Sequence, residues 1–254
     1  MPSCSADRKP YRGLSTLTRA AALFLCLGAI VLPLPAGEPA SYEAGEVALL
    51  KGDYAVAWRI LAPLAEAGDA RAQNDVGVMY GRGLGVVQSY AEAVMWITRA
   101  AEQGNPQAQS TLGYLYYRAR GVEQDYASAA LWSRRAAEQG IASAQSNLGL
   151  LYDKGQGVEQ SYTEAVRWYR RAAEQGFPEA QRNLGSMYEH GNGVPADSVL
   201  AYAWYGVASA GGDEVALQLR ARMTARMSEA DVTRAREVAR QLHGRFGAPG
   251  HEAR

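Results

Sequence analysis

One pattern returns every 36 residues along most of this chain. It reads A-Q-x-x-(L/V)-G-x-x-Y, then G-x-G-V, then A-x-x-W, then A-A-E-Q-G, and four copies lie between residues 72 and 216. The first alanine of the pattern keeps the step throughout, at Ala72, Ala108, Ala144, Ala180 and Ala216. A fixed period of roughly 20 to 50 residues is typical of a solenoid, whose units bury their apolar faces only against their neighbours. We therefore expect a row of stacked repeats and not a single central core.

Within one repeat the apolar residues have helical spacing. Ala108, Leu112 and Tyr116 stand four residues apart and form one stripe, and Ala129 and Trp132 begin a second stripe in the other half of the repeat. No alternating strand pattern competes with these stripes. The sequence therefore predicts two helices per repeat, each of roughly 12 to 14 residues, joined by the G-x-G-V turn.

Start and stop signals bound these helices. Asn105 before Pro106 is a good N-cap followed by proline at the first helical position, and Ser89 and Ser161 each begin a capping box. Glycines that suit a left-handed residue follow the last apolar position: Gly104, Gly140 and Gly176.

A glycine inside the first helix of every repeat needs a structural reason. Gly113 and its equivalents lie where glycine costs ~1 kcal/mol relative to alanine. We expect close approach of the paired helix, with the missing side chain making room for its Trp or Ala. The tryptophans lie in an apolar stripe, which predicts core packing and not a ladder for stacking a ligand: Trp96, Trp132, Trp168 and Trp204.

These motifs resemble the Sel1-like repeat family, a relative of the tetratricopeptide repeat. The copy at residues 144–176 is similar to the family consensus along almost its whole length. The resemblance implies an all-α, right-handed α-α superhelix of 36-residue helix-turn-helix repeats over residues 41–215. In that array a degenerate half repeat precedes four full repeats that start near residues 72, 108, 144 and 180.

The repeat pattern fades after Ala216. Ser228 and Asp231 are placed to cap a last helix that runs to about His243, with Val232 and Ala235 on its buried face. Residues 216–243 are therefore expected to be capping helices, which give a solenoid a polar outer side. Residues 244–254 are expected to form a disordered tail.

The first 36 residues have the order of a secretory signal peptide. A basic front precedes an uncharged apolar run at residues 20–34, and small residues suited to cleavage stand at Ala36 and Ala40. The alternative is an uncleaved membrane anchor, for which the apolar run is short. We expect export to the periplasm or the cell exterior. Both cysteines, Cys4 and Cys26, would leave with the signal, so the mature chain would form no disulfide.

Catalytic and metal-binding motifs are not found. The chain has 26 basic and 26 acidic residues, a balance that does not favour nucleic acid as a partner. Its three histidines form no zinc motif. Glu102, Glu138 and Glu174 recur with the period, so we expect them to form helix-end or inter-repeat hydrogen bonds. We expect no enzyme activity, no cofactor and no metal.

The resemblance also implies where a partner would bind. In the related tetratricopeptide family the first helices line a concave groove that holds an extended peptide. The equivalent positions vary between repeats here, while the packing positions do not. They combine amides, tyrosines and cations, which can bind peptide groups, apolar side chains and carboxylates. The candidate groove residues are Asn74, Arg82, Ser110, Tyr114, Tyr117, Arg118, Asn147, Lys154, Arg182 and Asn183. The alternative is an ordinary solvated face.

Three functions remain open from the sequence. The first is an exported, non-catalytic adaptor that binds a protein or extended peptide, as a monomer that does not span the membrane after signal cleavage. The second is a protein that binds a cell-envelope polymer such as peptidoglycan. The third is a β-lactam hydrolase-like enzyme, which some cysteine-rich members of the family resemble. The disulfide-stapled helix pairs of those members are absent here.

Overall fold

The computed structural model describes residues 41–247. The chain divides into two units, residues 1–39 and 40–254, and the described residues belong to the second unit. The expected signal peptide and residues 248–254 of the expected tail lie outside the described part.

The described part is built of helices alone. Residues 41–247 contain twelve helices and no strand. They are α1 (Tyr42–Lys51), α2 (Tyr54–Glu66), α3 (Ala70–Arg82), α4 (Tyr90–Glu102), α5 (Pro106–Arg118), α6 (Tyr126–Glu138), α7 (Ala142–Lys154), α8 (Tyr162–Glu174), α9 (Pro178–His190), α10 (Ser198–Ala210), α11 (Glu214–Thr224) and α12 (Glu229–Phe246).

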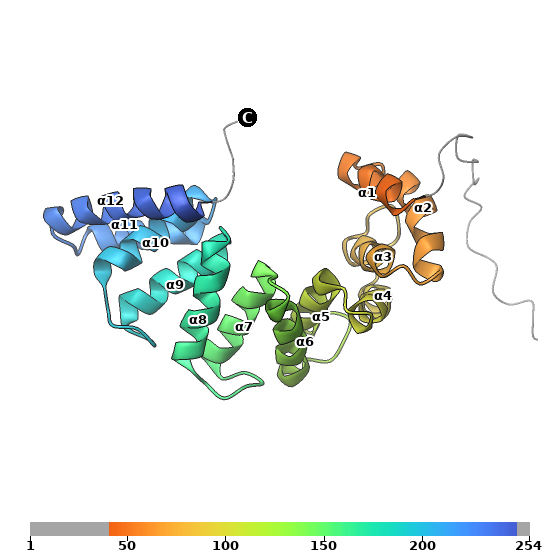
Figure 1. Ribbon diagram of the computed structural model, residues 1–254, viewed down its shortest axis with the longest axis horizontal. Coiled ribbons are helices and arrows are strands. Elements are labelled where there is room, and N and C mark those ends of the chain that lie inside the picture. The colour runs from red at the N-terminus through yellow and green to blue at the C-terminus, as the bar shows by residue number, and fades with distance from the viewer. Residues whose placement is uncertain (1–40, 248–254) are drawn as a thin grey trace, which may run out of the picture. The chain divides into compact units, whose positions relative to one another are not determined.

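Each 36-residue repeat forms one helix pair. The pairs α3–α4, α5–α6, α7–α8 and α9–α10 pack internally and against the next pair in chain order, as Figure 1 shows. All eight helices have 13 residues, within the predicted length. The expected all-α solenoid is therefore confirmed, and the degenerate half repeat is a full helix pair, α1–α2.

The predicted caps hold the helix ends. Asn105, Ser89 and Ser161 are N-caps whose side chains accept hydrogen bonds from backbone N–H groups of the first turn. Gly104, Gly140 and Gly176 have φ of 89°, 90° and 80°, the left-handed conformation that glycine adopts without strain.

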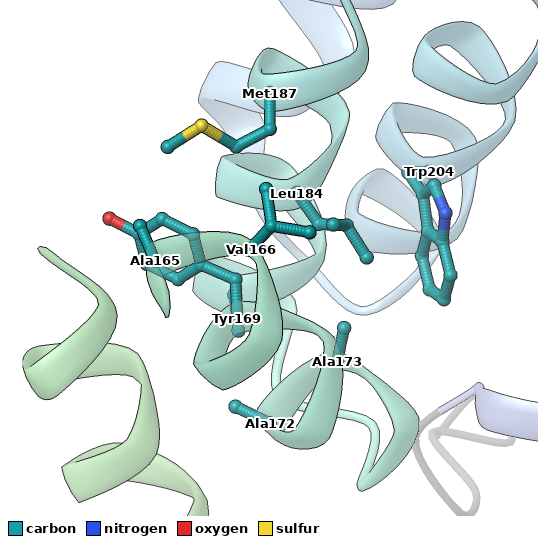
Figure 2. Close-up of a cluster of buried hydrophobic side chains, with 9 residues drawn as sticks. Ala165, Val166, Tyr169, Ala172, Ala173, Leu184, Met187 and Trp204 are labelled. Carbon is teal, nitrogen blue, oxygen red and sulfur yellow. The ribbon is translucent and has the colours of Figure 1, made fainter. Parts of the chain in front are cut away.

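The helical glycines mark close approach of the paired helix. The expected Ala is a neighbour, since a Cβ built on Gly77 would lie 3.2 Å from the Ala93 carbonyl oxygen, but the nearest side chain is not the expected Trp. A Cβ built on Gly149 would lie 2.7 Å from the Tyr169 ring, and one on Gly77 would lie 2.6 Å from Ile97. The contact residue directly follows the tryptophan of the repeat in sequence. The tryptophan itself shares a core cluster with its own first helix and the preceding repeat, as Trp168 does with Leu148 and Ala137. Trp168 and Trp204 are buried, as predicted, and Figure 2 shows Trp204 of α10 beside Leu184 of α9.

Glutamines link the two ends of each repeat to one another and to the preceding repeat. Gln175 donates to the side-chain oxygen of Gln145 (2.8 Å). The side-chain nitrogen of Gln145 donates to the Ala137 carbonyl of the preceding repeat (3.3 Å). The same chain of bonds recurs from Gln139 to Gln109 and from Gln103 to Gln73. The expectation that Glu102, Glu138 and Glu174 make such bonds is wrong. Those carboxylates are exposed, and the adjacent glutamine points inward in their place.

The C-terminal helices close the array. Ser228 caps α12 as predicted, and Val232 and Ala235 are buried. The helix continues beyond the expected end at about His243, so residues 244–246 are helical and not part of a tail. Its last residue explains the extension, because Phe246 stacks on Trp204 with ring centroids 6.2 Å apart. The Phe246 carbonyl also accepts a hydrogen bond from Gln181 (2.9 Å).

None of the helices between residues 41 and 247 is long and apolar enough to cross a membrane.

Candidate binding groove

A groove of about 460 Å³ lies on the face formed by the first helices of consecutive repeats. Its walls come from α3, α4, α5 and α7, and the start of α9 closes one end. The polar and aromatic side chains that line it are Arg82, Tyr90, Ser110, Thr111, Tyr114, Arg120, Ser143, Asn147, Phe177 and Glu179.

Four of the ten predicted site residues meet in this groove. Arg82 comes from α3, Ser110 and Tyr114 from α5, and Asn147 from α7. Tyr114 is 37% exposed, so the edge and face of its ring are available for contact. These residues hold different positions of the repeat, and the packing of consecutive first helices brings them to one groove.

One end of the groove is cationic and aromatic. The Arg120 guanidinium carbon lies 5.6 Å from the Tyr90 ring centroid and 5.8 Å from that of Tyr114. These contacts hold the side chain over both rings, where its N–H groups remain free to bind an anion. The sequence analysis missed Arg120 and Tyr90. The sequence does set Arg120 apart, because it is the only cation at this position of the G-x-G-V turns. The equivalent residues are Leu84, Gln156 and Asn192.

The other end of the groove is polar and acidic. The Ser110 and Ser143 hydroxyls share a hydrogen bond of 3.0 Å, and Asn147 stands one turn further along α7. Glu179, in the first turn of α9, adds a carboxylate. The groove therefore changes from basic to acidic along its length.

Two other predicted residues make packing contacts and are not among the residues that line this groove. The Tyr117 ring packs against Tyr126 at 5.7 Å, within the core between α5 and α6. The Arg182 guanidinium is bound to the Asp213 carboxylate at 2.8 Å, which ties α9 to the start of α11. Both side chains are therefore taken up by the array itself.

Asn74 is part of the junction with α1. It donates to Asp75, which also accepts a hydrogen bond of 2.8 Å from the Tyr42 hydroxyl. Burial raises the pKa of Asp75, although the two hydrogen bonds oppose that shift. The Tyr42 side chain of α1 contacts this part of α3, and the groove lining on α3 begins after it, at Gly77.

The remaining three residues lie on helix surfaces and not among the groove lining. Arg118 and Lys154 are exposed in the last turns of α5 and α7, and Lys154 pairs with the adjacent Asp153 at 3.0 Å. Asn183 is half-buried on α9. Of the predicted set, Arg82, Ser110, Tyr114 and Asn147 line the groove.

Among residues 41–247 no group of three or more His, Cys, Asp or Glu side chains could hold a metal ion.

Fold and groove together define a repeat scaffold of stacked helix pairs with a groove on one face. The chain belongs to the Sel1 repeat family, because four consecutive Sel1 repeats match residues 70–105, 106–141, 142–177 and 178–213. The matched repeats start two residues before the predicted phase. Sel1 repeats serve in general as scaffolds for protein interactions, and the fold is typically non-catalytic.

Solved structures of Sel1 repeat proteins are similar to this chain. A Sel1 repeat protein from Oxalobacter formigenes is 32% identical, with a TM-score of 0.65 over 81% of this chain and 85% of that one. A protective antigen of uropathogenic Escherichia coli strains, which displays an SLR fold, is 28% identical with a TM-score of 0.54. The match covers 77% of this chain and 50% of the antigen, so this chain spans half of that protein's length. No curated protein matches the chain.

Proposed function

We propose that this protein is an exported, non-catalytic adaptor that binds an extended segment of a partner protein in the groove. One observation carries the proposal. A single groove of about 460 Å³ is lined by side chains from three consecutive first helices. The packing of the repeats does not require these side chains. A set of varied polar and aromatic residues on an otherwise repetitive framework is what selection by a partner would produce.

The chemistry of the groove fits a peptide. The Asn147 amide can donate to a peptide carbonyl and accept from a peptide N–H. Tyr114 and Tyr90 offer rigid aromatic surface at a low entropic cost. Arg82 and Arg120 favour an acidic residue at their end of the groove, and Glu179 favours a basic residue at the other.

Selection from a displayed random-peptide library tests this proposal directly. The chain should enrich peptides with an acidic residue and a basic residue at a fixed separation. A Tyr114→Ala/Arg120→Ala variant should lose at least tenfold in affinity for an enriched peptide, since both side chains would contact it.

Tyr162→Ala/Arg167→Ala is a matched control, because it removes an exposed tyrosine and an exposed arginine from α8 outside the groove. Its affinity should equal that of the parent. Equal losses in both variants, or enrichment of no peptide by the parent, would contradict the peptide-binding proposal.

Peptidoglycan remains a second candidate, since the hydroxyl groups of Ser110, Ser143 and Tyr114 line the same groove. Sedimentation with purified cell wall separates the two candidates. Retention of the parent, with loss in the Tyr114→Ala/Arg120→Ala variant, would assign the groove to the polymer.

Export is tested on the secreted or periplasmic fraction of expressing cells. Mass spectrometry of the mature chain should find an N-terminus at Gly37 or Ser41, the residues that follow the two cleavage positions. A chain that keeps residues 1–36 would contradict the export proposal.

A further inference from the structure

A second hollow lies between the three C-terminal helices, on elements that do not line the groove. Its volume is about 650 Å³, and its walls come from α10, α11 and α12, which lie together at the C-terminal end of the array in Figure 1. The residues that line it are Tyr202, Gly206, Ala210, Arg220, Arg236, Ala239, Arg240, His243 and Gly244.

Small residues on the second helix of the last repeat create this space. Gly206 and Ala210 of α10 stand where the preceding repeats have Arg170 and Glu174. Arg170 donates to the Tyr188 hydroxyl at 2.9 Å, so in that repeat the long side chain covers the helix. Gly206 has no side chain to fill this position. The Arg220 side chain lies over its backbone, and the terminal nitrogen of Arg220 would be 3.7 Å from a Cβ built on Gly206.

The hollow is lined by cations without matching carboxylates. Arg220, Arg236, Arg240 and His243 face it, and no acidic residue is among its lining. Only Arg240 has a carboxylate partner in the described part of the chain, Glu237 on its own helix. Two arginines near this end of the array do pair with carboxylates of other elements, Arg182 with Asp213 and Arg226 with Glu189. Unpaired guanidinium groups that share one hollow repel each other, and a bound anion would relieve that repulsion.

We propose that this hollow binds a phosphoryl group. Guanidinium groups only donate hydrogen bonds, and those of Arg220, Arg236 and Arg240 reach the hollow from two different helices. A planar carboxylate is satisfied by a single arginine, whereas a tetrahedral phosphoryl group accepts from several directions and carries more charge. The volume of about 650 Å³ admits a substituted phosphate, and Tyr202 and Ala239 offer apolar contact to the substituent.

Calorimetric titration of the full chain with inorganic phosphate and with pyrophosphate tests the proposal. Pyrophosphate should bind, and more weakly as the salt concentration rises. Arg220→Gln/Arg236→Gln should lower the affinity at least tenfold, because two charge-assisted contacts are lost. Circular dichroism melts of the variant should show that it is folded, since neither side chain makes an ion pair in the described structure.

Arg234→Gln/Arg167→Gln is the matched control, because it removes the same charge from exposed positions outside the hollow. Its affinity should stay within about twofold of the parent value if binding is local and not due to net charge. Equal losses in both double variants, or no binding of either phosphate by the parent, would overturn the proposal. Tighter binding of a polyglutamate peptide than of pyrophosphate would overturn it too, by assigning the hollow to an acidic protein segment.

Vesicles that contain an anionic phospholipid identify the source of the group. Binding that free pyrophosphate reverses and that Arg220→Gln/Arg236→Gln loses would support a lipid headgroup as the ligand. Pyrophosphate binding without vesicle binding would support a soluble phosphorylated ligand.

Discussion

At the scale of single residues, backbone space and backbone conformation decide which positions tolerate a side chain. The glycine of the L-G motif has no room for a Cβ, because the buried ring of Tyr169 lies against Gly149. Gly244, in the last turns of α12, meets nothing within 4 Å. Two glycines in helices therefore have opposite roles, which their helix propensity alone does not distinguish.

We expect Gly149→Ala to lower the free energy of unfolding by about 1–3 kcal/mol, because the new methyl group overlaps the Tyr169 ring. Gly244→Ala should raise it by about 0.5–1 kcal/mol, the ordinary gain in helix propensity. Urea unfolding of both variants measures the contrast. Equal effects in the two would show that close packing at Gly149 is not the reason for its glycine.

A second prediction concerns Ala119, the one non-glycine residue among 41–247 with positive φ (53°). Its counterparts are glycines, so Ala119→Gly should relieve left-handed strain and raise the free energy of unfolding by about 0.5–1 kcal/mol. The reverse change at the same place in the next repeat, Gly155→Ala, should lower it. Urea unfolding is again the measurement, and a loss of stability in Ala119→Gly would contradict the strain argument.

At the scale of helices, a partly buried carboxylate joins the last repeat to the cap. Glu189 of α9 accepts hydrogen bonds from the Tyr205 hydroxyl (2.8 Å) and from Arg226 (2.7 Å), next to Arg222. Burial by itself would raise the pKa of Glu189, but these donors and the nearby Arg222 hold it below its usual range. The junction between α9, α10 and the α11–α12 connection therefore depends on an ionised Glu189.

A depressed pKa stabilises the folded state above the ordinary carboxyl pKa, and this contribution is lost as the pH falls through the folded value. We expect Glu189→Gln to be less stable than the parent at pH 7, with a difference that shrinks as the pH falls below the ordinary carboxyl pKa. Urea unfolding across this range measures it. A difference that does not change with pH would contradict the role of the charge.

At the scale of the whole array, the repeats are coupled through neighbouring interfaces. The buried glutamines carry part of that coupling, because each bonds both to the repeat before it and to the glutamine after it. In the last repeat the partner glutamine is replaced by Gly211, and the Phe246 carbonyl of α12 accepts from Gln181 in the same region. The Gln181 amide nitrogen thus donates both to the Ala173 carbonyl of the preceding repeat and to the returning helix.

We expect Gln145→Ala to lower the free energy of unfolding by about 1–3 kcal/mol, because it leaves buried polar groups of two repeats without partners. It should also broaden the urea transition, since weaker coupling lets the two halves of the array unfold separately. Gln218→Ala on exposed α11 is the control and should change neither quantity. A sharp transition in Gln145→Ala would show that apolar packing alone couples the repeats.

The sequence by itself determined the period, the helix pairs, their caps and the buried stripes. These features depend on spacings within about one repeat, such as Asn105 before Pro106 or Ala108 four residues before Leu112. Such local spacings can be recognised in one sequence without an alignment. The candidate groove was predicted only in part. Arg82, Ser110, Tyr114 and Asn147 share it, whereas Tyr117 and Arg182 are used in packing.

Only the tertiary structure decided which side chains meet across repeats. Arg120 reaches Tyr90 of the preceding repeat, and α12 turns back so that Phe246 covers Trp204. Both outcomes depend on the angle at which successive helices pack. Contacts of many side chains set that angle, so no single sequence motif predicts it. For the same reason the cations of α11 and α12 come together over Gly206, although no sequence pattern links them.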